Sequence, residues 1–173
     1  SGSEITIALS TGTQGDGIIG FEGVAPGGVR RTTTRLLDGE FPKVRALFPN
    51  EHQTVATVDR ESLIESVKRV SLVAERNTAV QLAFADGVLT LDAGSGEEAQ
   101  ASESIEAVIT GEDITTGFNP TFLLDGLGAI EEPVVQLAFT QASKPVVMSG
   151  TATEGGAPTG HFRYLLMPRR LLS

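Results

Sequence analysis

The side chains that could carry out chemistry are few and lie far apart along the chain. His52 and His161 are the two histidines, and each lies near an expected turn, where a solvated surface histidine is the ordinary outcome. Glu97 and Glu98 have no companion ligands at metal-binding spacing. Asp125 fits a solvated carboxylate better than a general base. No nucleophile, base and orienting group follow in a recognisable order, so we expect no enzyme, no metal site and no cofactor.

The composition narrows the remaining classes of function. The chain has 173 residues, 40% of them hydrophobic, and a net charge of −9. This length allows one packed domain plus a fragment. The acidic balance argues against a generally basic surface for nucleic acid but leaves room for a local basic face. There is no cysteine, no signal peptide is visible, and no apolar run approaches the ~20 residues of a membrane span.

Three strands are expected in the first part of the chain. Residues 4–9, 18–22 and 29–36 have strand-like patterns and are separated by glycine-containing turns. A small antiparallel sheet without a helix is marginal by itself. This segment is therefore either an edge addition to the rest of the chain or half of a domain whose other half is absent.

Residues 51–173 have the pattern of a complete domain with two helices. Asp59 is expected to cap the first helix, which runs to about Arg76. Asn119 caps the second, with Pro120 at its first helical position. The order strand, helix, three strands occurs twice, so the sequence predicts an α+β domain with both helices on one side of a sheet. The expected strands are 54–58, 79–84, 88–92, 97–109, 114–118, 134–140, 145–149 and 162–167, with 150–160 as a flexible polar loop.

Three residues interrupt these patterns. Glu103 lies on the apolar side of the long strand 97–109, which suggests that the first part of this strand is exposed on both faces. Phe122 points away from the apolar stripe of the second helix. Leu72 shares a charged helix face with Arg69. An isolated exposed leucine usually has no role, and Phe122 could simply cover the apolar connector before residue 51.

Two stretches and one helix resemble a known family. Residues 37–49, LDGEFPKVRALFP, form a connector stiffened by Pro42 and Pro49. Residues 164–171, YLLMPRRL, form an apolar strand near the end of the chain. Residues 117–130 read GFNPTFLLDGLGAI. All three resemble the corresponding motifs of the bacterial DNA polymerase III beta subunit, the sliding clamp.

The resemblance implies a fold and a function. The fold would be the DNA clamp (processivity) fold, two helices against antiparallel sheets, with a partial middle domain at 1–37, a connector at 38–50 and the third domain at 51–173. The function would be that of a ring-shaped homodimer encircling duplex DNA in the cytoplasm, at the nucleoid, and tethering DNA polymerase III. Clamp-loader and repair proteins would dock through linear motifs with leucine and phenylalanine anchors, and no membrane would be involved.

The resemblance also assigns residues to these roles. Leu72 falls on the segment that meets the next protomer. The candidates for facing DNA are Arg60, Lys68, Arg69 and Arg76, although ordinary solvated helix charges explain any one of them equally well. Ala46 stands where some family members have arginine. The peptide-binding groove matches Pro42, Ala46, Leu47, Asn119, Phe122, Leu165, Met167, Pro168, Arg169, Arg170 and Leu171.

Two other hypotheses stay open. A β-rich surface or interaction domain without a DNA role would suit the acidic balance and the Gly/Ser/Thr turns, but not two capped helices. A hydrolase would need carboxylates that the sequence does not pair.

Overall fold

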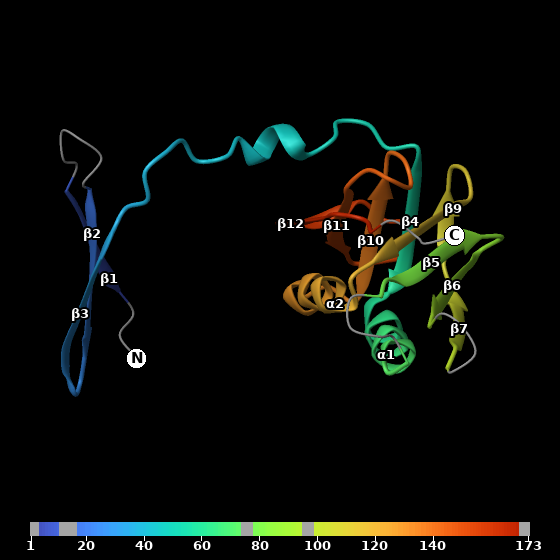
Figure 1. Ribbon diagram of the computed structural model, residues 1–173, viewed down its shortest axis with the longest axis horizontal. Coiled ribbons are helices and arrows are strands. Elements are labelled where there is room, and N and C mark those ends of the chain that lie inside the picture. The colour runs from blue at the N-terminus through green and yellow to red at the C-terminus, as the bar shows by residue number, and fades with distance from the viewer. Residues whose placement is uncertain (1–3, 11–16, 74–77, 95–98, 170–173) are drawn as a thin grey trace. The chain divides into compact units, whose positions relative to one another are not determined.

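The computed structural model describes residues 4–10, 17–73, 78–94 and 99–169 (Figure 1). The chain forms two compact units, Ser1–Val44 and Arg45–Ser173, which we call unit 1 and unit 2 and describe separately. Their boundary falls inside the stretch 38–50 that the sequence marks as a connector. No helix in the described part of the chain is long and apolar enough to cross a membrane.

Unit 1 contains the three expected strands. They are β1 (Ile5–Ser10), β2 (Ile18–Ala25) and β3 (Gly28–Arg35), and they pair antiparallel in the order β1-β2-β3. The alternating apolar side chains of β1 are exposed, by 67% at Ile5 and 61% at Ile7. Unit 1 therefore presents an apolar sheet face.

Unit 2 repeats one order of elements, as the sequence predicts. A short 3-10 helix, η1 (Val44–Leu47), leads into it, and strand, helix and three strands then occur twice, with one short extra strand between the halves. The elements are β4 (Thr54–Asp59), α1 (Arg60–Ser71), β5 (Val80–Ala85), β6 (Val88–Ala93), β7 (Ala101–Glu106), β8 (Val108–Thr110), β9 (Ile114–Phe118), α2 (Pro120–Ala129), β10 (Val134–Phe139), β11 (Val146–Thr151) and β12 (Pro158–Leu166).

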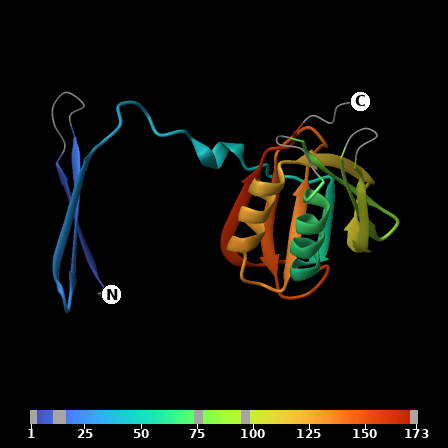
Figure 2. The same cartoon turned by 60° about the horizontal axis from the view of Figure 1, so that its bottom comes forward.

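The strands of unit 2 form two antiparallel sheets, as the family resemblance implies, where the element order alone suggested one. Their orders are β12-β11-β10-β4-β8 and β7-β6-β5-β9. β4, from the first half, pairs with β10 of the second half, and β9, from the second half, pairs with β5 of the first. Each half therefore gives its first strand to the other half's sheet, which interlocks the two halves. The helices lie side by side on one face of the strands (Figure 2).

One apolar core joins both sheets and both helices. The rings of Phe84 in β5 and Phe139 in β10 lie 5.3 Å apart at 56°, an arrangement typical of favourable aromatic pairs. The helix residues that pack into this core have apolar side chains that are fully buried: Leu63, Val67, Val70, Leu123 and Leu127. Each helix therefore buries one apolar stripe in the core.

The first helix is shorter than predicted. It ends at Ser71, not near Arg76, and residues 74–77 lie outside the described part of the chain. The Ser71 hydroxyl donates to the Lys68 carbonyl at 2.9 Å, and the Leu72 N–H donates to the Arg69 carbonyl at 3.2 Å. Such i−3 bonds tighten the last turn and compete with continuation of the helix.

The predicted long strand 97–109 is two strands in different sheets. β7 pairs with β6, and β8 pairs with β4. The chain bends at Ala107, whose N–H donates to the Gly87 carbonyl at 2.9 Å. Side-chain alternation continues through this bend, so the sequence periodicity does not show it.

The expected exposure of the first part of the predicted strand 97–109 on both faces is seen at Ala99 and Gln100, which are both exposed, but not at Glu103. Glu103 is half-buried, on the same side of β7 as Ile105, and its carboxylate accepts hydrogen bonds from Arg69 on α1. The loop expected at 150–160 is also shorter, because β11 extends to Thr151 and β12 begins at Pro158. The turn between them is fastened to the sheet where the Gly155 N–H donates to the Thr57 hydroxyl at 2.8 Å.

Candidate functional site

The segment after β12 crosses from one sheet to the other. The Arg169 N–H donates to the Gly117 carbonyl at 2.7 Å, so the tail is fastened to the free edge of β9. Leu166 faces the core, whereas Met167 is 63% exposed. This crossing presents Met167 next to the start of α2.

The start of α2 is fixed by its own capping residues. The Asn119 side-chain oxygen accepts from the Thr121 N–H at 2.9 Å, and Pro120 occupies the first helical position. Both features favour a helix start at this point. Phe122 follows in the first turn and is 55% exposed, off the core stripe as the helical period predicts.

Gly126 lets β12 approach α2 closely. A Cβ at this position would lie 2.7 and 2.8 Å from the Cδ1 and Cε1 atoms of Tyr164. Those distances are too short for carbon atoms, so only glycine accommodates the tyrosine ring where it lies.

These elements enclose a cavity of about 500 Å³, which we call the tail cavity. Its lining is mostly apolar and comes from α2, from β12 and from the segment after it. The lining residues are Asn119, Phe122, Tyr164, Leu165, Leu166, Met167, Pro168 and Arg169.

A second cavity, of about 310 Å³, lies between η1 and the β10–β11 loop, and we call it the connector cavity. One hydrogen bond attaches the loop to β9 and another closes the turn within it. The buried Thr116 hydroxyl donates to the Ala142 carbonyl at 2.9 Å, and the Lys144 N–H donates to the Gln141 carbonyl at 3.0 Å. The lining residues are Ala46, Leu47, Pro49, Thr140, Gln141, Lys144 and Pro145.

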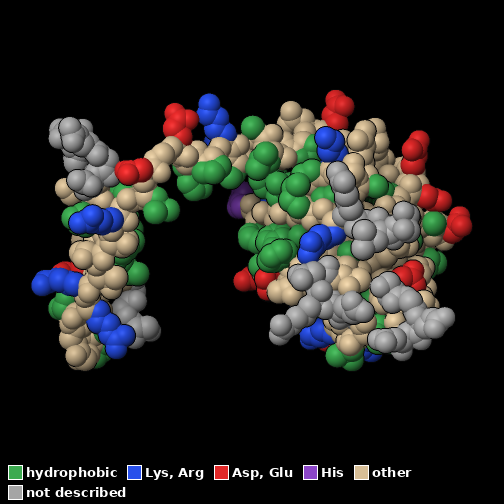
Figure 3. Space-filling view, viewed as in Figure 1, with side chains coloured by type: hydrophobic (Ala, Val, Ile, Leu, Met, Phe, Trp, Pro, Cys, Tyr) green, Lys and Arg blue, Asp and Glu red, His purple; other side chains and the backbone are tan. Residues whose placement is uncertain are grey.

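Three contacts tie the walls of these cavities together. The β10–β11 loop is held by Thr116 and the tail by Gly117, which are consecutive residues of β9. The Arg163 guanidinium lies 4.8 Å from the centre of the Phe48 ring, which joins β12 to the end of η1. Hydrophobic side chains gather on this part of unit 2, where η1, β12 and α2 lie (Figure 3). The two cavities are therefore neighbours on one surface.

The structure brings together most of the residues assigned to the groove. Six of them line the tail cavity, and Ala46 and Leu47 line the connector cavity. Pro42 belongs to unit 1, and Arg170 and Leu171 lie outside the described residues. The six are Asn119, Phe122, Leu165, Met167, Pro168 and Arg169.

Other lining residues were missed by the sequence reasoning. Tyr164 and Leu166 flank a predicted residue on β12, and the strand itself was the available signal. No sequence signal connects the β10–β11 loop with η1, because the two are far apart along the chain and meet only in the fold. The missed loop residues are Thr140, Gln141, Lys144 and Pro145.

The cationic side chains of α1 are engaged within the molecule. The Arg60 Nε donates to the Glu132 carbonyl at 2.9 Å. Lys68 pairs with Glu65 at 2.9 Å, and the hydrogen bond from Lys68 lowers the pKa of this carboxyl. Arg76 lies outside the described residues.

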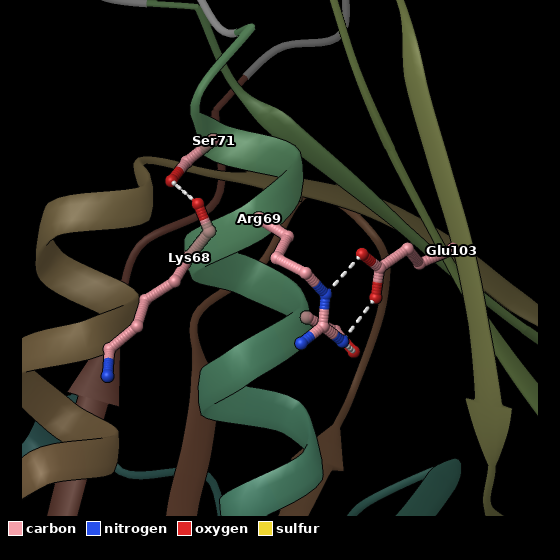
Figure 4. A network of polar contacts seen from close by, with 5 residues as sticks. Lys68, Arg69, Ser71 and Glu103 are labelled. Carbon is pink, nitrogen blue, oxygen red and sulfur yellow. Dashed lines mark hydrogen bonds and ion pairs between the residues drawn. The ribbon is translucent and has the colours of Figure 1, made fainter.

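Arg69 makes a two-point ion pair with Glu103 of β7. Its Nε and one terminal nitrogen lie 2.6 and 2.7 Å from the two carboxylate oxygens (Figure 4). These hydrogen bonds lower the pKa of Glu103 and raise the pKa of Arg69. The pair joins α1 to β7. Leu72, just past the helix, is 85% exposed.

The histidines and carboxylates that could carry out chemistry do not form a common site among the described residues. Among the described residues, no three His, Asp or Glu side chains are placed to hold a metal ion. Partial burial lowers the pKa of His52, and His161 and Asp125 are exposed.

Residues 45–169 match the family model described as the DNA polymerase III beta subunit, C-terminal domain. The chain belongs to the DNA polymerase III beta subunit family. It is 51% identical over 171 residues to the beta sliding clamp of Streptomyces coelicolor, a match covering 99% of this chain and 44% of that protein. The chain thus spans less than half the length of this beta subunit.

Solved beta subunits share the fold. The Caulobacter crescentus beta sliding clamp is 29% identical with a TM-score of 0.78, and the match covers 99% of this chain and 42% of that one. The Thermotoga maritima beta subunit is 25% identical with a TM-score of 0.77, covering 96% and 42%. The expected family and the α+β clamp fold, two helices against antiparallel sheets, are thereby confirmed. These relatives give no support to the β-rich surface domain.

Proposed function

We propose that the chain is the C-terminal part of a sliding clamp, a ring-shaped processivity factor that tethers DNA polymerase to duplex DNA. Residues 1–37 would be closing strands of the middle domain, 38–50 the connector and 51–173 the third domain. The protein would act by binding rather than by catalysis, without a cofactor, in the cytoplasm at the nucleoid. Membership of the beta subunit family supports this proposal.

The observation that carries the proposal is the tail cavity. Phe122 and Met167, distant in sequence, line one mostly apolar cavity and are both more than half exposed. A concave apolar site with a flexible thioether suits the apolar anchors of varied short peptides. The C. crescentus structure has PEG bound to a proposed beta-motif tethering region.

We propose that the tail cavity and the connector cavity together bind linear peptide motifs. Linear motifs of DNA polymerase III, the clamp loader and repair proteins would place leucine and phenylalanine anchors in them. Pro42, Arg170 and Leu171 would add to the same site in the full-length protein.

Fluorescence anisotropy with a labelled Gln-x-x-Leu-Phe peptide tests this function. We expect saturable binding to the chain and at least a fivefold loss of affinity in Met167→Ala, since a central anchor contact contributes more than about 1 kcal/mol. Val108→Ala is the matched control, because Val108 is 42% exposed on β8, at the opposite edge of the sheet from β12. A flat titration up to high micromolar protein, or equal losses in both variants, would count against peptide binding.

The DNA role would be topological. Arg60, Lys68, Arg69 and Arg76 would face the duplex and make sequence-independent, salt-screened contacts. The first three already have partners in this chain, so their net attraction for phosphate would be weak, as suits a protein that slides. Two protomers would close the ring, with Leu72 at the contact.

A further inference from the structure

We infer that the two cavities select their peptides by charge, and that Lys144 is the residue that determines this selectivity. The preferred ligand would be an extended apolar peptide that carries an aspartate or glutamate beside its anchors. This inference rests on the proposed peptide binding and deepens it.

The charges lining the cavities are of one sign. The whole chain carries a net charge of −9, yet no aspartate or glutamate is among the described residues that line either cavity. The charged lining residues are Lys144 in the connector cavity and Arg169 in the tail cavity. A cationic site on an acidic protein complements an acidic ligand.

These two cations also have no carboxylate partner among the described residues. The ion pairs found there join Arg31 to Glu22, Lys68 to Glu65 and Arg69 to Glu103. A carboxylate arriving at Lys144 would therefore not have to displace an existing ion pair.

The backbone of Lys144 is fixed before any ligand arrives. Its N–H is bonded to Gln141, the preceding Ala142 carbonyl is bonded to the buried Thr116 hydroxyl, and Pro145 restricts the next part of the chain. Only the lysine side chain has to be ordered on binding, which keeps the entropic cost of the contact low.

One short peptide can reach both cavities. Their walls are held by consecutive residues of β9, Thr116 and Gly117, and are joined again by the contact of Arg163 with Phe48. An extended chain advances about 3.3 Å per residue, so a few residues can place an anchor in each cavity and an acidic side chain beside Lys144.

Apolar burial would supply most of the affinity, and the charge would supply discrimination. Lys144 is exposed, so water weakens its attraction for a carboxylate. We expect an acidic peptide to bind roughly two- to fivefold tighter than its neutral isostere, as for exposed ion pairs.

The test uses anisotropy with labelled Gln-x-x-Leu-Phe peptides in matched pairs, with aspartate or asparagine placed in turn at each position beside the anchors. For at least one position, aspartate should bind tighter at low salt, and the difference should shrink at high salt. In Lys144→Gln the difference between the aspartate and asparagine peptides should be lost, whatever the change in the affinity that both peptides share. Lys68→Gln removes the same charge from α1 and should preserve the difference.

The outcomes separate this inference from the proposed function. Equal binding of both members of every pair would overturn charge selectivity and leave peptide binding intact. Charge selectivity through Lys144 would also be overturned if Lys144→Gln preserves the difference in affinity between the aspartate and asparagine peptides. It would likewise be overturned if Lys68→Gln removes that difference as completely as Lys144→Gln does. Failure of all peptides to bind would overturn both proposals.

Discussion

Gly126 illustrates how a single side-chain position shapes the tail cavity. Because Gly126 has no Cβ, the Tyr164 ring can pack directly against α2. Tyr164 in turn lines the tail cavity beside Leu165. The identity of this residue therefore affects both packing and the proposed site.

Gly126→Ala should destabilise unit 2 and weaken peptide binding. The new Cβ would lie 2.7 Å from the tyrosine ring, and overpacking costs more than the gain in helix propensity. We expect the free energy of unfolding to fall by roughly 1–2 kcal/mol, measured by urea denaturation followed by far-UV circular dichroism.

Gly128→Ala is the control within the same helix. No atom lies within 4 Å of its added Cβ, so alanine should raise the free energy of unfolding by about 0.5–1 kcal/mol through helix propensity alone. If both variants shift stability in the same direction, the close packing of Tyr164 on Gly126 is not what constrains this position.

Single residues differed in how well the sequence predicted them. Phe122 could be placed off the core stripe because helical periodicity fixes the direction of each side chain. Lys144 could not be assigned to a site, because it lines one cavity with η1 residues that are distant from it in the sequence. Pairwise contacts between distant segments leave no periodic signal.

At the scale of elements, the start of α1 depends on a capping carboxylate. The Asp59 side chain accepts from the Ser62 N–H at 2.8 Å. Hydrogen bonds from Ser62 lower the pKa of Asp59. The carboxylate is therefore the form that stabilises the folded chain.

The stabilisation by Asp59 should depend on pH. A group whose pKa is lower in the folded than in the unfolded chain stabilises the fold above its unfolded pKa, about 4, and this stabilisation is lost as pH falls through the folded value. At pH 7, Asp59→Ala should cost about 1 kcal/mol of unfolding free energy, and the cost should shrink below pH 4.

Asp59→Asn separates capping from titration. Asparagine caps a helix about as well as aspartate, so this variant should match the parent chain near pH 7 and lose less stability on acidification. Urea midpoints between pH 7 and pH 3 measure both effects. A cost of Asp59→Ala that does not change over this range would contradict the assigned role of the carboxylate.

Element type was predicted well and element ends less well. Both caps and the two helix stripes follow from local sequence, and the structure contains them. The end of α1 depends on hydrogen bonds around Ser71, and the division of β7 from β8 depends on which sheet each strand joins. Those choices are made by tertiary pairing.

At the scale of the whole molecule, the exchange of β4 and β9 between the halves interlocks unit 2. The repeated element order was visible in the sequence. The exchange of strands was not visible, because the alternation of side chains along a strand does not show which other strand it pairs with. The motifs in the connector, in α2 and in the tail nevertheless predicted the family, since local residue types specify these turns and caps.

Leu72 is the residue that we propose lies at the contact between two protomers of the full-length protein. It is 85% exposed at the end of α1, where burial in a partner would be favourable. In the full-length protein, Leu72→Asp should give a monomer in sedimentation velocity, and the conservative Leu72→Met should keep the dimer. A Leu72→Asp ring that persists at micromolar concentration would remove Leu72 from the contact.

The most direct test of the central claim, that the tail cavity binds peptides, is a methyl NMR titration. The chain has two methionines. Met148 is fully buried in the core, and Met167 is exposed in the tail cavity. On addition of a Gln-x-x-Leu-Phe peptide, the Met167 methyl signal should move saturably and the Met148 signal should move far less. If the Met167 methyl signal does not move at a saturating concentration of peptide, the claim that the tail cavity binds peptides is contradicted.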